Sequence, residues 1–115
     1  MEFLHASFVV AFFWLMVGHS LADYPLQGDF LAQGKNRHTP VGAIFWPHAI
    51  FAHSMIHAGF VALVTGSIWL GLAEAVIHAI TDLLKCDNWI GLRTDQTIHI
   101  VSKFAWAVIA TSAFV

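Results

Sequence analysis

Formal charge is scarce in this sequence. Asp, Glu, Lys and Arg make up only 10% of the 115 residues, whereas soluble domains carry about 25% to cover their surface. The net charge is −2 and no run of lysines or arginines occurs, which excludes the basic footprint of a nucleic-acid-binding protein. The single cysteine, Cys86, excludes an internal disulfide and metal sites built from CxxC motifs. The chain is therefore expected to face lipid rather than water, with no nucleic-acid partner.

Apolar residues take the place of the missing charge. They make up 58% of the chain, and the mean hydropathy is +0.72. They form four runs at residues 3–22, 47–64, 68–85 and 95–115, close to the ~20 residues that a helix needs to cross a bilayer. Joined by polar loops and a short turn, these runs predict an all-α fold: one integral membrane domain over residues 1–115, built as a four-helix transmembrane up-down bundle. Pro47 is expected in the first turn of the second helix, after a loop over residues 23–37.

The first apolar run also suits a signal peptide. Its leading charged residue is Glu2 rather than a lysine or arginine, and its apolar part exceeds the ~7–15 residues of a typical signal core. We therefore interpret it as a retained helix.

The lysines and arginines between the runs predict an orientation. Lys35 and Arg37 follow the first run, Lys85 and Arg93 flank the loop after the third run, and the turn at residues 65–67 has none. Because positively charged loops stay in the cytoplasm, both charged loops are expected there. The chain would then cross a bacterial inner membrane several times with both termini outside.

Ionisable side chains recur in pairs four residues apart, one pair in each run. This spacing places both members of a pair on one helix face. In an up-down bundle the four faces meet in the cytoplasmic half, and ionisable groups inside membranes usually point into the bundle. The pairs are His19 with Asp23, His53 with His57, His78 with Asp82, and Asp95 with His99.

These eight side chains predict a metal site, because helix bundles build dinuclear centres from such ligands on facing helices. We expect one or two divalent ions, zinc first and iron or manganese as alternatives, since imidazole and carboxylate suit these metals and matched thiolates are absent. Lys85 and Gln27 would bind an anionic or carbonyl group of a substrate. Asp95 or Asp23 would act as the general base.

Each pair also has a purely structural interpretation. Polar side chains hydrogen-bond membrane helices to one another, and Asp95 stands where an N-cap residue belongs. Asp29 and Asp87 are interpreted as solvated loop residues. The histidines assigned to interhelical hydrogen bonds are those without an acidic or histidine partner four residues away: His5, His38 and His48.

Two further charges lie deeper in the runs. Glu74 precedes His78 by four residues, and Lys103 follows His99 by four. Lys103 either pairs with Glu74 or extends along its own helix towards the interface.

The ordered motifs resemble one family. H-x3-D followed by L-Q, a lysine in the first loop, H-x3-H, H-x3-D-x2-K and D-Q-x2-H occur in this order from His19 to His99, as in the small prokaryotic and phage membrane proteins grouped as domain of unknown function 3307. The resemblance implies the fold and marks four residues besides the candidate ligands: Gln27, Lys35, Lys85 and Gln96. It implies no activity. More distantly, the H-x3-D motif looks like that of bacterial membrane-bound metal-dependent hydrolases.

We therefore expect a metal-dependent hydrolase of a membrane-associated, lipid-like substrate. Three alternatives stay open. An ion or proton transport protein would continue the polar path through Glu74, Lys103 and His5. A bis-histidine haem bundle would leave the aspartates unexplained, and a phage or bacterial membrane interaction protein would use the polar cluster only for structure.

Overall fold

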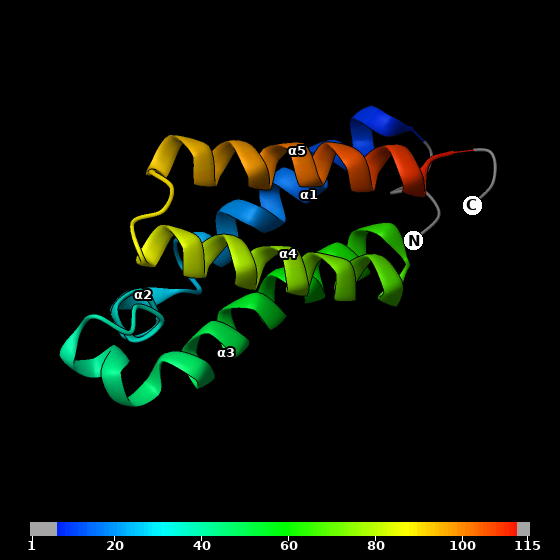
Figure 1. Cartoon of the computed structure of the whole chain (residues 1–115). Helices are drawn as coiled ribbons and strands as arrows, with labels where there is room; N and C mark the ends of the chain where they lie inside the picture. Colours follow the sequence, from blue (N-terminus) through cyan, green and yellow to red (C-terminus); the bar gives the residue numbers. More distant parts are fainter. Residues whose placement is uncertain (1–6, 113–115) are drawn as a thin grey trace.

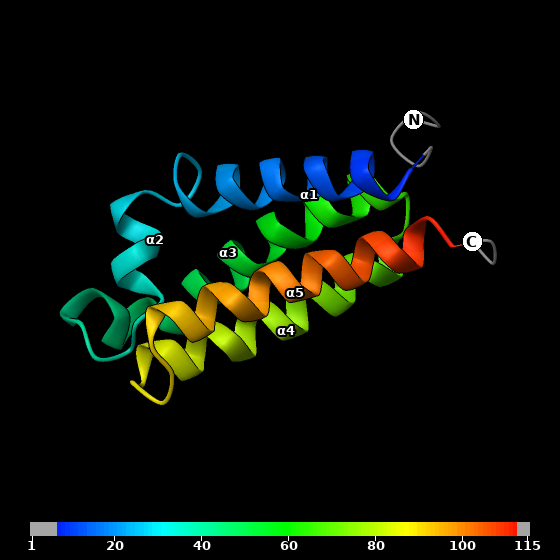
Figure 2. The same ribbon diagram turned by 90° about the horizontal axis from the view of Figure 1, so that it is seen from above.

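The computed structural model describes residues 7–112, which form five α-helices and no strand. The helices are α1 (Phe8–Asp23), α2 (Gly28–Gly34), α3 (Pro40–Thr65), α4 (Ile68–Cys86) and α5 (Leu92–Ala110). The four longer helices lie side by side and alternate in direction, so that α1 begins and α5 ends at the same end of the bundle (Figure 1 and Figure 2). The predicted all-α class is confirmed, and the four predicted runs correspond to α1, α3, α4 and α5. His5 and the first residues of the predicted first span lie outside the described residues.

Helix α3 begins earlier than the apolar pattern predicted. Thr39 is its N-cap: the Thr39 Oγ1 atom accepts a hydrogen bond from the backbone N–H of Gly42 at 2.8 Å, and Pro40 occupies the first turn. Pro47 lies inside the helix, which corrects its expected place in the first turn. Two prolines suit a helix start here, and the capping threonine decides between them. At Gly42 a Cβ atom would overlap the carbonyl oxygen of Asn36, so the loop can approach this helix only at glycine.

A tight turn joins α3 to α4, as the sequence predicted. Gly66 ends α3 with a φ of 73°, a left-handed conformation that glycine adopts without a steric cost. Ser67 then caps α4, and its Oγ atom accepts from the backbone N–H of Leu70 at 3.2 Å. This turn makes α3 and α4 antiparallel neighbours and brings their polar faces to the same level.

Helix α2 was not predicted. The segment after α1 turns through 85°, forms two helical turns and packs against α3. Its proline and glycines, Pro25, Gly28 and Gly34, are typical of loops, which explains the wrong prediction. As a consequence, the chain after α2 stays in contact with the bundle instead of extending away from it.

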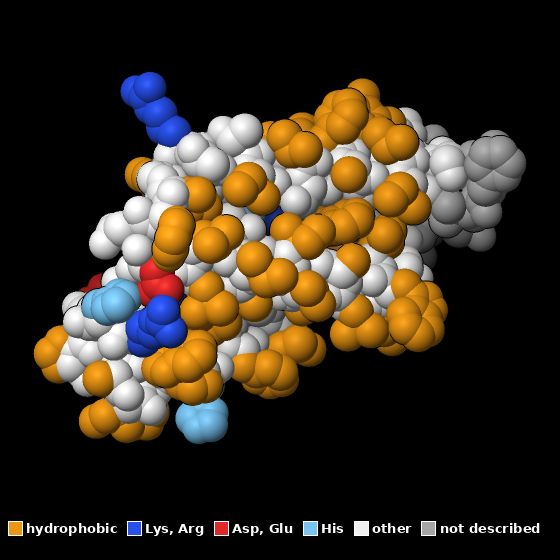
Figure 3. Space-filling view, in the orientation of Figure 1, with side chains coloured by type: hydrophobic (Ala, Val, Ile, Leu, Met, Phe, Trp, Pro, Cys, Tyr) orange, Lys and Arg blue, Asp and Glu red, His pale blue; other side chains and the backbone are white. Residues whose placement is uncertain are grey.

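The bundle has an apolar half and a polar half. At the end where α1 begins, small and large apolar side chains form a buried cluster: Ala11, Leu15, Val61, Val64, Trp106 and Ala107. Towards the other end the buried side chains are mostly histidine, carboxylate and lysine. Outside, large apolar side chains cover much of the bundle, and on the face in Figure 3 charged side chains gather towards the end that carries α2.

By length and apolar composition, one helix of residues 7–112 is suited to cross a membrane, namely α3. A second span results if the bent pair α1 and α2 counts as one broken span. The predicted bundle of four spans is therefore not established by these criteria. The described α1 has only 16 residues, while α4 and α5 each carry three formal charges. Several of these charged side chains are buried in the polar half of the bundle and do not lie on its outer surface.

Candidate metal centre

The structure gathers all eight predicted ligands in the polar half of the bundle. Each long helix presents its pair on the face that points inward, as the spacing of four residues predicted. Seven of the eight residues are buried, and the Asp23 side chain retains 14% exposure. The helices contribute as follows: α1 His19 and Asp23, α3 His53 and His57, α4 His78 and Asp82, and α5 Asp95 and His99.

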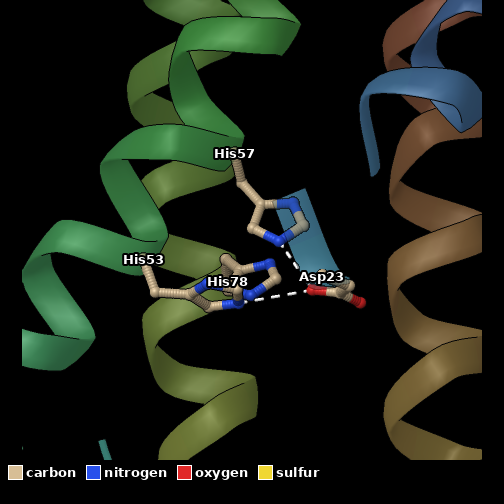
Figure 4. Close-up of side chains that lie close together, drawn as sticks. All are labelled: Asp23, His53, His57 and His78. Atoms are coloured by element: carbon tan, nitrogen blue, oxygen red, sulfur yellow. Dashed lines mark hydrogen bonds and ion pairs between the residues drawn. The ribbon is translucent and has the colours of Figure 1, made fainter. Parts of the chain in front are cut away.

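Three histidines and one aspartate, which we name the Asp23 group, converge from three helices: Asp23, His53, His57 and His78 (Figure 4). The Asp23 Oδ1 atom lies 2.8 Å from the His57 Nε2 atom and 3.3 Å from the His53 Nε2 atom. The His78 ring stacks on the His57 ring with centroids 3.8 Å apart. One ligand atom from each residue lies within 4.8 Å of the others, and a tetrahedral zinc site needs about 3.3–3.5 Å between its ligand atoms.

A second set, the Asp95 group, consists of Asp82, Asp95 and His99, whose ligand atoms also lie within 4.8 Å of one another. The His99 Nε2 atom lies 3.2 Å from the Asp95 Oδ1 atom. Asp95 is not an N-cap, because Gly91 caps α5 and Asp95 is buried inside the first turn. The two groups share no residue. A third set, Glu74 with His78 and His99, overlaps both groups.

Several buried imidazole nitrogens lack a hydrogen-bond partner among the residues that the structure describes. Most buried polar atoms in proteins have such a partner. Unused imidazole nitrogens and nearby carboxylates are the donor set that zinc, iron and manganese take, so these residues fit the predicted ions. The atoms concerned include Nε2 of His53 and Nε2 of His78, two members of the Asp23 group.

His19 lies beside the two groups and belongs to neither. Its Nε2 atom lies 3.3 Å from the Asp23 Oδ2 atom and donates to the Gln96 Oε1 atom at 3.1 Å. The Gln96 Nε2 atom in turn donates to the Asp95 Oδ2 atom at 3.1 Å. This chain of contacts orients one carboxylate of each group, the role that neighbours of metal ligands usually have.

Lys35 is the site residue that residue-level reasoning missed. It follows α2 and is buried, and its Nζ atom donates to the Asp82 Oδ2 atom at 3.1 Å. In the sequence, Lys35 counted only as one of the positive loop charges that predict the orientation of the chain in the membrane. Nothing local in the sequence indicates that α2 turns inward, and the one available signal was the place of Lys35 in the family motif.

A cavity of about 120 Å³ lies beside the ligand groups, at the end of the bundle that carries α2. Lys85 faces it with 29% of its side chain exposed, and the Lys85 Nζ atom is 3.8 Å from the Asp95 Oδ2 atom. The Gln27 Nε2 atom donates to the Asp23 carbonyl oxygen at 3.0 Å, while its buried Oε1 atom has no hydrogen-bond partner in residues 7–112. The four predicted catalytic residues line this cavity: Asp23, Gln27, Lys85 and Asp95.

Behind the ligand groups, Lys103 pairs with Glu74, which confirms one of the two roles expected for this lysine. The Glu74 Oε2 atom also lies 3.4 Å from the His78 Nδ1 atom. This carboxylate therefore stands where it orients the imidazole of a candidate ligand.

The charged residues outside the cluster correct two predictions. His38 does not make the interhelical membrane contact that was expected, and Asp87 is not the free, solvated loop residue that was expected. Instead, the Asp87 carboxylate binds His38 at 2.8 Å and also binds Arg37. The hydrogen bond from His38 and the guanidinium of Arg37 lower the pKa of Asp87. His48 is exposed and does not fill its expected interhelical role, and Asp29 is exposed as expected but lies on α2.

Comparison with known proteins gives a family and no further relative. No curated protein and no solved structure matches the chain, so the distant likeness to membrane-bound hydrolases has no support there. The family model described as Protein of unknown function (DUF3307) matches residues 11–114. This range includes every candidate ligand and all residues that line the cavity. The chain belongs to the DUF3307 family.

Proposed function

We propose that the protein is an integral membrane protein that holds one or two divalent ions and hydrolyses a membrane-associated substrate. The Asp23 group carries the proposal: three imidazoles and one carboxylate from three helices offer ligand atoms within 4.8 Å of one another. Polar residues that only hold helices together have no need to converge in this way. The adjacent cavity gives a substrate access to the ligand groups.

The distribution of side chains supports the membrane location. Ionisable side chains of membrane bundles face the bundle interior, and lysine, carboxylates and histidines fill the polar half here. Large apolar side chains such as Val9, Phe51 and Val101 are 72%, 67% and 60% exposed, and apolar surface of this extent favours contact with lipid. The charged loops lie at the α2 end, so this end faces the cytoplasm of a bacterial inner membrane and both termini face outward.

The residues around the cavity suit a hydrolytic reaction. The ligand groups would hold a divalent ion, and a bound ion would supply Lewis-acid polarisation of the scissile bond. The carboxylates of Asp95 and Asp23 line the cavity, where either accepts the proton of an attacking water. Lys85 donates to the anionic or carbonyl oxygen of the substrate, as expected. Gln27 differs from its expected role, because its Nε2 atom already donates to the Asp23 carbonyl oxygen and its unpartnered Oε1 atom accepts from a hydroxyl group instead. The apolar cluster at the opposite end keeps water out of that half.

Two alternatives fit the geometry less well. For transport, the polar path would have to continue beyond Glu74 and Lys103, but within the described residues the apolar cluster around Leu15 and Val61 follows. For a bis-histidine haem, two imidazoles must stand on opposite sides of a macrocycle. The rings of His57 and His78 instead stack directly on each other at 3.8 Å.

The test is metal analysis combined with hydrolysis assays. Protein purified in detergent without chelator should carry at least one zinc, iron or manganese ion per chain. It should hydrolyse at least one substrate in a panel of lipid phosphates, esters and amides, lose that activity with chelator and regain it with added metal. Metal-loaded protein that hydrolyses nothing in the panel would reject the hydrolase, and protein that takes up no metal would leave the cluster as a structural element.

A further inference from the structure

We propose that the cavity beside the ligand groups is a phosphate subsite, so that the substrate is a lipid-like phosphate ester. This inference rests on the proposed metal-dependent function and adds the class of substrate. The cavity is where α2, through Lys35, and the end of α4, through Lys85, each bring an ammonium group to the ligand carboxylates.

The two ammonium groups are placed to bind a further anion. Lys35 lies 3.1 Å from Asp82, and Lys85 lies 3.8 Å from Asp95. Both aspartates belong to the Asp95 group. An ammonium group has three donors, so each lysine retains donors for an oxygen in the cavity. Once the aspartates bind an ion, they also balance less of the lysine charge.

The charge of the cluster favours an anionic substrate over a neutral one. Four carboxylates face three ammonium groups, which leaves one negative charge while the imidazoles are neutral. One divalent ion turns this balance to one positive charge, and two ions turn it to three. An uncompensated charge in a buried site is costly. A phosphate ester supplies the compensating negative charge, whereas a neutral amide or carboxylic ester does not. The groups counted are Asp23, Glu74, Asp82 and Asp95 with Lys35, Lys85 and Lys103.

The size and rim of the cavity indicate which part of the substrate it takes. Its volume of about 120 Å³ is well below the ~300–1,000 Å³ of sites that enclose a drug-sized ligand. One tetrahedral anion fits, and the organic part of the ester has to stay outside. The exposed side chains of Tyr24 and Leu92 line the same cavity. They offer apolar surface to an alkyl group that extends into the bilayer.

The proposed step is the hydrolysis of one P–O bond. The oxygen of water forms a bond to phosphorus, and the bond between phosphorus and the alcohol oxygen breaks. One proton of the water passes through the base, Asp95 or Asp23, to the alcohol, and the other stays on the phosphate product. No oxidant or reductant takes part.

The binding test uses inorganic phosphate and full-length protein that elemental analysis has first shown to be metal-loaded. Isothermal titration compares wild type with Lys85→Gln and with the control Arg93→Gln, which removes an exposed charge outside the cavity. Loss of a charged hydrogen-bond donor should weaken phosphate binding about tenfold or more in Lys85→Gln, with metal content unchanged. Arg93→Gln should bind phosphate like wild type.

The outcomes separate the inference from the function on which it rests. Metal-loaded wild type that does not bind phosphate, or Lys85→Gln that binds it as tightly as wild type, overturns the subsite and leaves the metal site standing. Protein that takes up no metal overturns the proposed function instead. Dodecyl phosphate in micelles should be hydrolysed faster than methyl phosphate in water, and equal rates would reject the lipid-like ester.

Discussion

Lys103 and Glu74 form an ion pair between α5 and α4 in which the Nζ and Oε1 atoms are 2.7 Å apart and the side chains are 1% and 0% exposed. The indole N–H of Trp106 donates to the same Glu74 oxygen at 3.0 Å. A buried pair of this kind contributes little beyond its desolvation cost, but it leaves each partner dependent on the other. It also fixes the carboxylate that contacts His78.

Breaking this pair on one side should destabilise the bundle. Glu74→Gln leaves the ammonium group of Lys103 buried without its counter-charge, which should lower the free energy of unfolding by about 3–5 kcal/mol. Thermal melting in detergent measures the effect. The double variant Glu74→Gln with Lys103→Met should recover a large part of the loss, because no buried charge remains. If the double variant loses as much stability as the single variants Glu74→Gln and Lys103→Met together, the two side chains are not coupled.

Removing the metal should lower the melting temperature. Without an ion, the carboxylates of Asp23, Asp82 and Asp95 lie in one low-dielectric space with less positive charge around them. Adding metal back to the chelated protein should restore the stability by about 2.7 kcal/mol at a hundredfold excess over Kd. Unchanged melting of demonstrably loaded protein after chelation would contradict a role of the ion in stability.

His78→Ala should lower the metal content, since His78 belongs to the Asp23 group and contacts Asp82 at 3.4 Å. His48→Ala is the matched control, because His48 is exposed and lies outside every candidate ligand group. Elemental analysis of both purified variants measures the difference. Equal metal content in the two variants would remove His78 from the ligand set, whatever happens to stability.

The Asp87 contacts should make stability depend on pH in acid. Because the pKa of Asp87 is lower in the folded chain than its usual value, the ionised carboxylate stabilises the fold above the unfolded pKa of about 3.9. This contribution is lost as the pH falls through the lowered folded pKa. The difference in melting temperature between wild type and Asp87→Asn should therefore shrink from pH 6 towards pH 3, with Asp29→Asn as an exposed control. A difference that stays constant over this range would contradict the ion pair.

Cysteine labelling in intact cells should reveal the orientation. In a Cys86→Ala background, a membrane-impermeant thiol reagent added outside should label Ser67→Cys in the turn between α3 and α4. It should not label Asn36→Cys or Gly91→Cys, because the loops that carry Lys and Arg stay in the cytoplasm. Labelling at position 36 or 91 from outside would invert or reject the proposed topology.

The gathering of the cluster was open to prediction because it depends on local periodicity. A spacing of four residues places His78 and Asp82 on one helix face whatever surrounds the helix. The short turn at Gly66 makes α3 and α4 antiparallel, and therefore aligns His53 and His57 with that face. The depth of each pair followed from its distance to the end of its apolar run. The sequence alone was therefore sufficient for the helical class and for the gathering of the eight residues in one half of the bundle.

The division of these ligands into groups was decided by tertiary structure. Whether His19 joins an ion or orients Asp23 depends on differences of an ångström or two between helices, which arise from packing along their whole length. The start of α3 at Pro40 rather than Pro47, in contrast, follows from a local signal, the Thr39 cap directly before Pro40. The spacing of residues within one helix does not determine the distances between side chains on different helices.

Helix α2 is the clearest example of a structure that the sequence did not predict. Pro25, Gly28 and Gly34 describe a loop equally well, and the local composition does not set the 85° bend after α1. That bend carries Lys35 to Asp82, a residue 47 positions later in the chain. The sequence by itself determined which side chains face inward, because a helix repeats every ~3.6 residues. Only the tertiary structure decided which of them meet and that a lysine completes the cavity, because those contacts join segments that no local pattern relates.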